Sequence, residues 1–198
     1  MSEETLGWVL TYDSYDPDRE GLHEALCTLG NGYFATRGAS PDTSDDGTHY
    51  PGTYLAGGYN RLTSEVSGRK IENEDLVNLP NWLPLTFRIG EGKWFHIDET
   101  EILSYRQSLD LKRGLLLREI RARDGEGRIT RWSEKRLVSM ADRHLAGLSV
   151  TITPENWSGR MQFRTGLDGS VTNNGVARYR QLASQHLDIL ELDHLGAD

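Results

Sequence analysis

A chain of 198 residues, of which 36% are hydrophobic, is long enough to form one folded domain with a sizeable core. Its 30 Asp and Glu residues outnumber its 22 Lys and Arg residues, and the net charge of -8 disfavours nucleic acids and membrane surfaces as partners, because both are negatively charged. The single cysteine, Cys27, can form neither an internal disulfide nor a thiolate metal cage.

The N-terminal region predicts a cytoplasmic protein with one short helix. Residues 1–5 are acidic where a signal peptide would be basic, and no apolar run approaches the roughly 20 residues that cross a bilayer. Residues 19–29 form the best helical segment. Its apolar residues share one face, which we expect to be buried: Leu22, Ala25, Leu26 and Leu29.

A glycine-rich segment follows the predicted helix. Gly30, Asn31 and Gly32 predict a sharp structural turn, because glycine adopts positive φ freely and asparagine tolerates it. The third glycine of a dinucleotide-binding fingerprint is replaced by Ala35, and no Lys-Ser or Lys-Thr pair follows. Nucleotide binding is therefore rejected, and no cofactor is expected.

Residues 39–81 lack clean alternation and predict long loops with one or two short strands. Loops of this length in a compact domain are often functional, or they pack against something else. The acidic clusters around Asp42 and Glu72 are typical of a solvated surface. The Asp42 cluster also lacks the ligand spacing of a calcium loop.

Aromatic and amide side chains gather in the second half of this stretch. Sugars stack their C–H faces on aromatic rings, and their hydroxyls bond to planar polar groups. The candidates for carbohydrate or interdomain contact are Tyr54, Tyr59, Arg61, Asn78, Asn81 and Trp82. The competing and favoured explanation is that these side chains pack the domain itself or its boundary with a neighbour.

Alternating apolar residues predict most of the strands. In residues 85–89 the odd positions should face the core, and the glycine-containing loop 91–93 should lead into a second strand at 94–97. Residues 116–123 and 129–138 should pair across the turn at 124–127.

Further strands are expected towards the C-terminus. Residues 148–154 show the cleanest alternation, which Pro154 ends. Residues 161–165 should form part of another hairpin, with a loop at 168–170. A turn at 173–175 and a last strand at 186–192 complete the pattern.

No catalytic residue and no metal ligand is predicted. Glycoside cleavage needs an acid of raised pKa set near a second carboxylate, and the sequence shows no such pair in an apolar setting. The six histidines are scattered without i, i+4 spacing or a neighbouring cysteine set, so a zinc site is not expected. Cys27 lies on the apolar helix face and is expected to be a buried, inert thiol.

Several motifs occur together in a fixed order: 29–33 with 36–38, 51–59, 74–82, 109–118, 154–159 and 167–175. In this order they resemble the N-terminal domain of glycoside hydrolase family 65, which comprises maltose, trehalose and kojibiose phosphorylases and related trehalose hydrolases. The resemblance covers nearly the whole chain.

The resemblance implies an all-β fold, a large antiparallel β-supersandwich of the galactose mutarotase type with at most one short helix near the N-terminus. In the family this domain precedes an (α/α)6 barrel, and the enzyme cleaves an α-glucosidic bond with inversion, using phosphate or water. The general acid, the phosphate ligands and most sugar ligands lie on the barrel, and no position here matches them. Residues 1–198 are therefore expected to be one domain, truncated at its C-terminal end, without the catalytic barrel.

Two functions remain open. The first is a non-catalytic domain that supports the barrel and contributes to the substrate entrance or to a homodimer contact, with disaccharide and inorganic phosphate bound at the barrel. The alternative is an independent carbohydrate-binding module built on residues 50–82. Either way, the chain alone is expected to have no activity, and the disaccharide and the choice between phosphorolysis and hydrolysis stay open.

Overall fold

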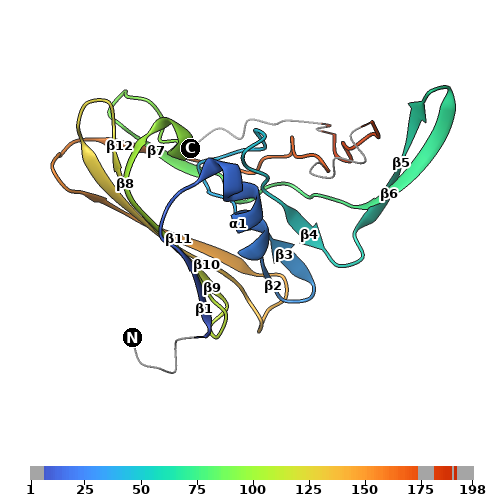
Figure 1. Ribbon diagram of the computed structural model, residues 1–198, viewed down its shortest axis with the longest axis horizontal. Helices are drawn as coiled ribbons and strands as arrows, with labels where there is room; N and C mark the ends of the chain where they lie inside the picture. Colours follow the sequence, from blue (N-terminus) through green and yellow to red (C-terminus); the bar gives the residue numbers. More distant parts are fainter. Residues whose placement is uncertain (1–6, 174–180, 189, 191–198) are drawn as a thin grey trace, which may run out of the picture.

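A five-stranded antiparallel sheet is the largest element of the fold. The structure is a computed structural model and describes residues 7–173, 181–188 and 190. The strand order in the main sheet is β1-β8-β9-β10-β11 (Figure 1). Its strands are β1 (Val9–Tyr12), β8 (Glu101–Asp110), β9 (Leu115–Arg123), β10 (Ile129–Val138) and β11 (Ala146–Pro154).

Smaller antiparallel sheets and one short helix complete the described part of the chain. One sheet pairs β7 (Leu85–Ile89) with β12 (Met161–Thr165), another joins β2 (Leu29–Gly30), β3 (Phe34–Thr36) and β4 (Thr53–Leu55), and the last pairs β5 (Tyr59–Val66) with β6 (Arg69–Leu76). The helix is α1 (Glu20–Leu26), with 3-10 turns at Pro17–Arg19 and Ile97–Glu99. The all-β prediction with one short N-terminal helix is confirmed. In the described residues no helix has the length and apolarity to cross a bilayer.

The hairpin of β9 and β10 forms as predicted. The two strands pair in register around Ile120 and Trp132, and the turn at 124–127 joins them. Alternate residues of both strands are buried, since successive side chains point to opposite faces. The strand at 148–154 also forms, as β11, beside β10.

The region after β7 differs from the prediction. Residues 94–96 are irregular, and the 3-10 turn Ile97–Glu99 follows, so the expected strand at 94–97 is wrong. The loop folds back over β7 instead: the Phe95 amide donates to the Phe87 carbonyl at 2.7 Å, and the Thr86 hydroxyl donates to the Phe95 carbonyl at 2.6 Å. The strand partner of β7 is instead β12, some seventy residues later in the chain. In the described residues, neither β7 nor β12 forms a hairpin with the segment next to it in sequence.

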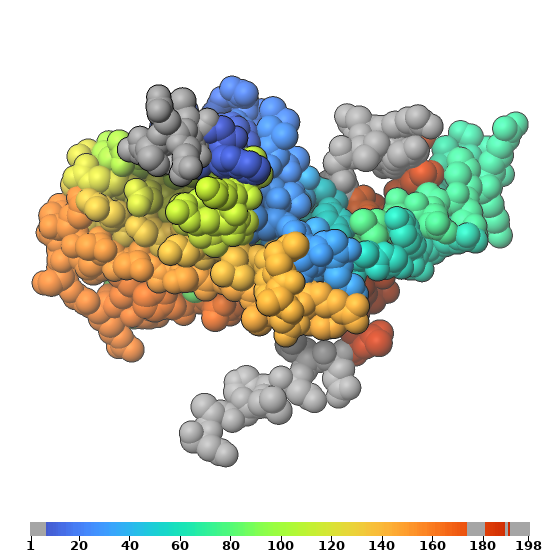
Figure 2. All heavy atoms as spheres, turned by 90° about the horizontal axis from the view of Figure 1, so that it is seen from below, coloured from blue at the N-terminus to red at the C-terminus, as the bar shows by residue number. Residues whose placement is uncertain are grey.

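The hairpin of β5 and β6 was not expected, because 39–81 predicted mainly loops. Each strand has eight residues, paired from Tyr59 opposite Leu76 to Val66 opposite Arg69. At the turn, Ser67 and Gly68 adopt φ of 53° and 75°. The hairpin projects from the body of the domain, as the blue-green arm in Figure 2 shows. Its alternation was hidden because polar residues occupy both faces.

The predicted C-terminal strand at 186–192 is not formed in those of its residues that the structure describes. Residues 186–188 and 190 lie outside any strand, and the remaining positions are outside the described residues. The predicted turn at 173–175 is likewise described only at Asn173.

Two apolar clusters form the core on the inner face of the main sheet. The larger lies between the main sheet and β7–β12, and comprises Phe87, Ile89, Phe95, Ile97, Tyr105, Ile120, Ala122 and Trp132. The smaller lies under α1 and β2, and comprises Cys27, Leu29, Leu109, Leu116 and Val138. Burial raises the pKa of the Cys27 thiol, which disfavours the reactive thiolate.

Candidate functional site

Two of the candidate contact residues, Asn78 and Asn81, hold backbone segments together. Both side chains are 2% exposed. The Asn78 Oδ1 accepts the amide of Thr53 at 2.9 Å, and its Nδ2 donates to the Pro51 carbonyl at 3.1 Å. The Asn81 Oδ1 accepts the amide of Leu83 at 3.0 Å. These amide groups are already engaged inside the domain.

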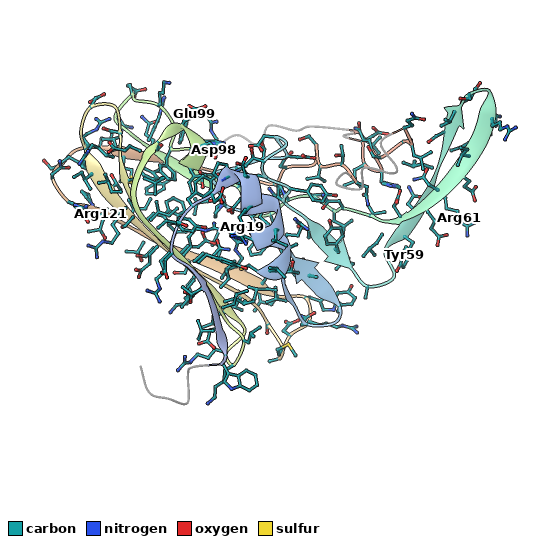
Figure 3. The ribbon with its side chains drawn as sticks, in the orientation of Figure 1. Arg19, Tyr59, Arg61, Asp98, Glu99 and Arg121 are labelled. Carbon is teal, nitrogen blue, oxygen red and sulfur yellow. The ribbon has the colours of Figure 1, made fainter. Side chains whose placement is uncertain are left out.

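Tyr59 and Arg61 lie on the projecting hairpin, well away from α1 (Figure 3). Tyr59 is 60% exposed. Arg61 is a surface residue whose Nε donates to Glu74 at 2.6 Å and whose Nη1 lies 3.6 Å from Glu72. Both are free to meet another surface.

Tyr54 and Trp82 are half-buried beside β3 and β4 rather than on the hairpin. The Trp82 Nε1 donates to the Thr36 hydroxyl at 3.3 Å, and its ring lies 6.4 Å from that of Phe34. Burial raises the pKa of Tyr54. The structure therefore distributes the six candidates over loops, β4 and the hairpin rather than around one site.

The turn at Gly30, Asn31 and Gly32 joins β2 to β3. Gly32 has φ of 84°. The Asn31 Oδ1 accepts the amide of Phe34 at 2.9 Å, and its Nδ2 donates to the Ser139 carbonyl at 2.7 Å. Asn31 thereby ties this turn to the end of β10.

A band of charged side chains crosses the inner face of the main sheet between the two apolar clusters. Arg118 of β9 and Arg136 of β10 are 1% and 0% exposed, and Glu134 of β10 is 3% exposed. Glu134 bridges the two guanidinium groups, with distances of 3.2 Å to Arg118 and 2.5 Å to Arg136. We call these three residues the ionic band.

The ionic band also fixes the segment after β3. Arg118 donates through Nε and Nη2 to the Gln107 Oε1 at 2.9 and 2.7 Å, and through Nη2 to the Gly38 carbonyl at 2.8 Å. Arg136 donates to the Ala39 carbonyl at 2.9 Å. A guanidinium suits this role because its five donors are held in one plane.

Helix α1 turns its polar face to this band, so the predicted burial of its apolar face is wrong for Leu22, Ala25 and Leu26, although Leu29, just beyond the helix, is buried. Glu20, His23 and Glu24 are buried, whereas Leu22 and Leu26 are each 51% exposed. The reason is electrostatic, because the charged middle of the sheet needs polar partners above it. Ala25 is exposed beside the two leucines.

His49 connects the helix to the turn at Ile97–Glu99. Its Nδ1 lies 3.0 Å from the Glu24 Oε1, and its Nε2 lies 3.2 Å from the Asp98 Oδ2. Tyr15 hydrogen-bonds to both His49 and Asp98. Burial alone would lower the pKa of His49, but the hydrogen bond and charge of Glu24, together with the charges of Asp46 and Asp98, outweigh burial and raise it.

This cluster contains a set of metal-type ligands, two of which, Glu24 and His49, already form an ion pair with each other. Oxygen and nitrogen atoms of Glu20, Glu24 and His49 lie within 4.8 Å of one another. Glu24 has His49 at 3.0 Å and Arg37 at 3.7 Å as cationic partners. We therefore assign the set to the network that holds α1.

The raised pKa of His49 predicts a pH effect on stability. A raised pKa in the folded state means that the contribution of His49 is fully present below its unfolded pKa of about 6.5 and is lost as pH rises through the folded pKa. Urea unfolding between about pH 5.5 and 8.5 should show the wild type losing stability relative to His49→Gln as pH rises. Parallel curves for the two proteins would contradict this.

The sequence contained a signal for the ionic band that alternation alone did not reveal. Arg118 has the same inward parity as Leu116 and Ile120 in β9, so an ideal amphipathic strand would have an apolar residue there. In β10, Glu134 and Arg136 interrupt the series between Trp132 and Val138 in the same way. Paired inward charges of opposite sign on adjacent predicted strands would have indicated a buried ion pair.

Comparison with known proteins gives a consistent result. The family model described as "Glycosyl hydrolase family 65, N-terminal domain" matches residues 10–197. An "Uncharacterized glycosyl hydrolase" of Mycobacterium tuberculosis is 51% identical over 189 residues, which are 96% of this chain and 14% of that protein. The kojibiose phosphorylase of Halothermothrix orenii is 33% identical, over 87% of this chain and 21% of its own length.

Two more comparisons also cover most of this chain but only a small part of the matched protein. The trehalose 6-phosphate phosphorylase of Lactococcus lactis is 31% identical, over 93% of this chain and 24% of its own. The solved structure of a putative kojibiose phosphorylase from human microbiome superimposes with a TM-score of 0.66 at 20% identity, over 74% of this chain and 20% of that one. The chain thus spans between 14% and 24% of the length of these relatives.

Proposed function

Because the chain belongs to the N-terminal domain family of glycosyl hydrolase family 65, we propose that it is the non-catalytic part of an α-glucoside phosphorylase or hydrolase. Its role is to support a separate catalytic domain, the (α/α)6 barrel that the sequence resemblance implies. The proposal rests on the lengths of the matched proteins. The family match spans residues 10–197 of this chain, whereas the relatives are several times longer than the chain. The enzyme is proposed to act in the cytoplasm as a homodimer.

The arrangement of carboxylates supports a structural role. Glu134 is shared between two buried arginines, and Glu24 faces His49. A catalytic acid for glycoside cleavage needs a proton to give and room for the sugar beside it. Glu134 and Glu24 instead use their carboxylate oxygens as acceptors for neighbouring side chains and backbone.

Two exposed surfaces suit contact with the catalytic domain or with the second copy. The first is the apolar face of α1, where Leu22, Ala25 and Leu26 are exposed on a helix whose other side is fixed by buried hydrogen bonds. The second is the hairpin with Tyr59 and Arg61, because a two-stranded hairpin is marginally stable without packing partners. Substrate entrance contacts are proposed for the hairpin rather than for Asn78 and Asn81.

An activity assay tests the proposal. The purified chain, incubated with kojibiose or trehalose and inorganic phosphate, is expected to release neither glucose nor glucose 1-phosphate above background. The Halothermothrix orenii kojibiose phosphorylase provides the positive control with kojibiose. Turnover by the chain that a single substitution within it abolishes would overturn the proposal.

A further inference from the structure

Strand β11 forms one edge of the main sheet, and among the described residues no strand pairs with its outer side. It has nine residues, which makes it the longest edge strand of the described sheets. Its pairing with β10 runs from Val138 opposite Ala146 to Thr130 opposite Pro154 without a register shift. A long and regular edge of this kind is a surface that a further strand can extend.

The register of β11 shows which of its backbone groups are free. At one end the Ser139 amide donates to the Leu145 carbonyl at 2.9 Å. At the other end the Glu155 amide donates to the Ile129 carbonyl at 2.9 Å. Because hydrogen-bonded pairs alternate along an antiparallel ladder, the odd-numbered residues of β11 bond to β10. The even-numbered residues therefore direct their amides and carbonyls away from the sheet: Ala146, Leu148, Val150 and Ile152.

β11 lacks the features that usually keep an edge strand from pairing. Natural proteins protect such edges with charged side chains, proline, bulges or a very short strand. β11 contains no charged residue, and its single proline, Pro154, is its last residue. By contrast, β1 at the other edge of the main sheet has only four residues, and the strands of the projecting hairpin carry charges such as Arg61, Lys70 and Glu72.

The apolar face of β11 is only partly covered. Leu148, Val150 and Ile152 share the inward parity, and two of them, Val150 and Ile152, pack against the larger apolar cluster. All three side chains nevertheless remain half-buried, whereas Trp132, opposite Ile152 on β10, is buried. A strand placed beside β11 would remove more of this apolar surface from water, which is favourable.

We propose that two copies of this chain pair through their β11 strands, antiparallel about a two-fold axis at Val150, so that the main sheet continues from one copy into the other. In this register Leu148 lies opposite Ile152 of the second copy, and free amides meet free carbonyls. A two-fold contact of one patch with itself is the usual arrangement in homodimers. Although each copy has a net charge of -8, the paired strands bring no charges of their own together.

This inference deepens the proposed function, and it rests on the homodimer included there, for which it names the contact. The apolar face of α1 and the projecting hairpin then remain for the catalytic domain. The test below measures the association of this chain and not the cleavage of a sugar. Either proposal can therefore fail without the other.

Sedimentation equilibrium of the purified chain tests the pairing. We expect a monomer–dimer equilibrium with a dissociation constant on the order of 10–100 µM, because a contact between two edge strands is small. Ser149 and Thr151 are exposed on the outer face of β11, and in the proposed register each lies opposite the other across the axis. Ser149→Lys combined with Thr151→Lys places like charges opposite each other and should weaken the dimer about tenfold. Ser149→Glu combined with Thr151→Glu should do the same.

Mixing the two double variants identifies the contact, because lysines then face glutamates. The mixture should form a heterodimer at least as tight as the wild-type dimer, while each variant alone dissociates. Ser104→Lys combined with Thr63→Lys is the control, since it makes the same change in charge at exposed positions away from β11 and should leave association unchanged. Circular dichroism checks that each variant is folded.

Three results would overturn the proposal. The first is a wild-type chain that stays monomeric at about 1 mM, which would favour a strand of the catalytic domain as the occupant of this edge. The second is a dimer that the β11 variants weaken no more than the control does. The third is a mixture of the lysine and glutamate variants that associates no better than either variant alone.

Discussion

Replacing Arg118 with methionine should destabilise the fold by about 3–5 kcal/mol, a large share of the roughly 5–15 kcal/mol that stabilises a typical domain. Methionine fills similar space but donates no hydrogen bond. The substitution would leave the Gly38 carbonyl without this donor and would remove one of the two cations beside Glu134. Gln107 would lose both guanidinium donors to its Oε1. Urea denaturation measures the difference.

Arg61→Met is the control for this experiment. Arg61 also pairs with two carboxylates, but its side chain is 64% exposed, and solvent screens such pairs. Its replacement should change the free energy of unfolding by about 0.5 kcal/mol or less. Similar unfolding curves for Arg118→Met and wild type would show that the ionic band is not required for stability.

On helix α1, shortening a glutamate should cost far more than shortening a leucine. Glu24→Ala removes the carboxylate that faces His49 and accepts the Tyr50 amide at 2.9 Å, and should cost about 3 kcal/mol. Leu26→Ala, two residues along, should cost about 0.5 kcal/mol or less, because half of the leucine side chain is already in solvent.

Both substitutions introduce alanine into the same helix, so a change in helix propensity does not explain a difference in stability between Glu24→Ala and Leu26→Ala. Thermal and urea unfolding near pH 7 provide the comparison. Glu24→Gln should fall between wild type and Glu24→Ala, since the amide oxygen can still accept from Tyr50 but carries no charge. If Leu26→Ala proved the more damaging change, the helix would be turned the other way in solution.

Local alternation was enough to predict β9, β10 and β11, whose partners are close in sequence, but it did not predict β8, which pairs with β9, or the hairpin of β5 and β6. Leu116, Ile120 and Ala122 point inward from β9, Trp132 and Val138 point inward from β10, and a glycine-containing turn joins the strands. Such a hairpin needs no information from the rest of the chain. The same reasoning identified β11.

Long-range pairing and the polar character of one hairpin both limited the prediction. β7 pairs with β12, and Phe95 packs under β7 without forming a strand, because its backbone bonds go to Phe87 and Thr86. The hairpin of β5 and β6 has no apolar face to reveal it; Arg61 opposite Glu74 is typical of its pairs. Secondary structure there follows from pairing rather than from burial.

The sites were harder to predict than the strands. The stacked aromatic rings of the larger apolar cluster come from Phe87 of β7, Phe95 of the following loop and Trp132 of β10, which are spread over more than forty positions. The sequence instead drew attention to a local concentration of aromatic and amide residues. Of these, Asn78 and Asn81 are occupied by backbone groups of the domain itself.

The buried charges on β9 and β10 also determine how these strands can align. A slip of two residues would keep every side chain on its own face, so an entirely apolar inner face would tolerate it. Here such a slip would move Glu134 from its place opposite Arg118 to one opposite Leu116 or Ile120. A carboxylate forced against aliphatic neighbours is strongly unfavourable, so misaligned versions of the sheet are penalised and one alignment is selected.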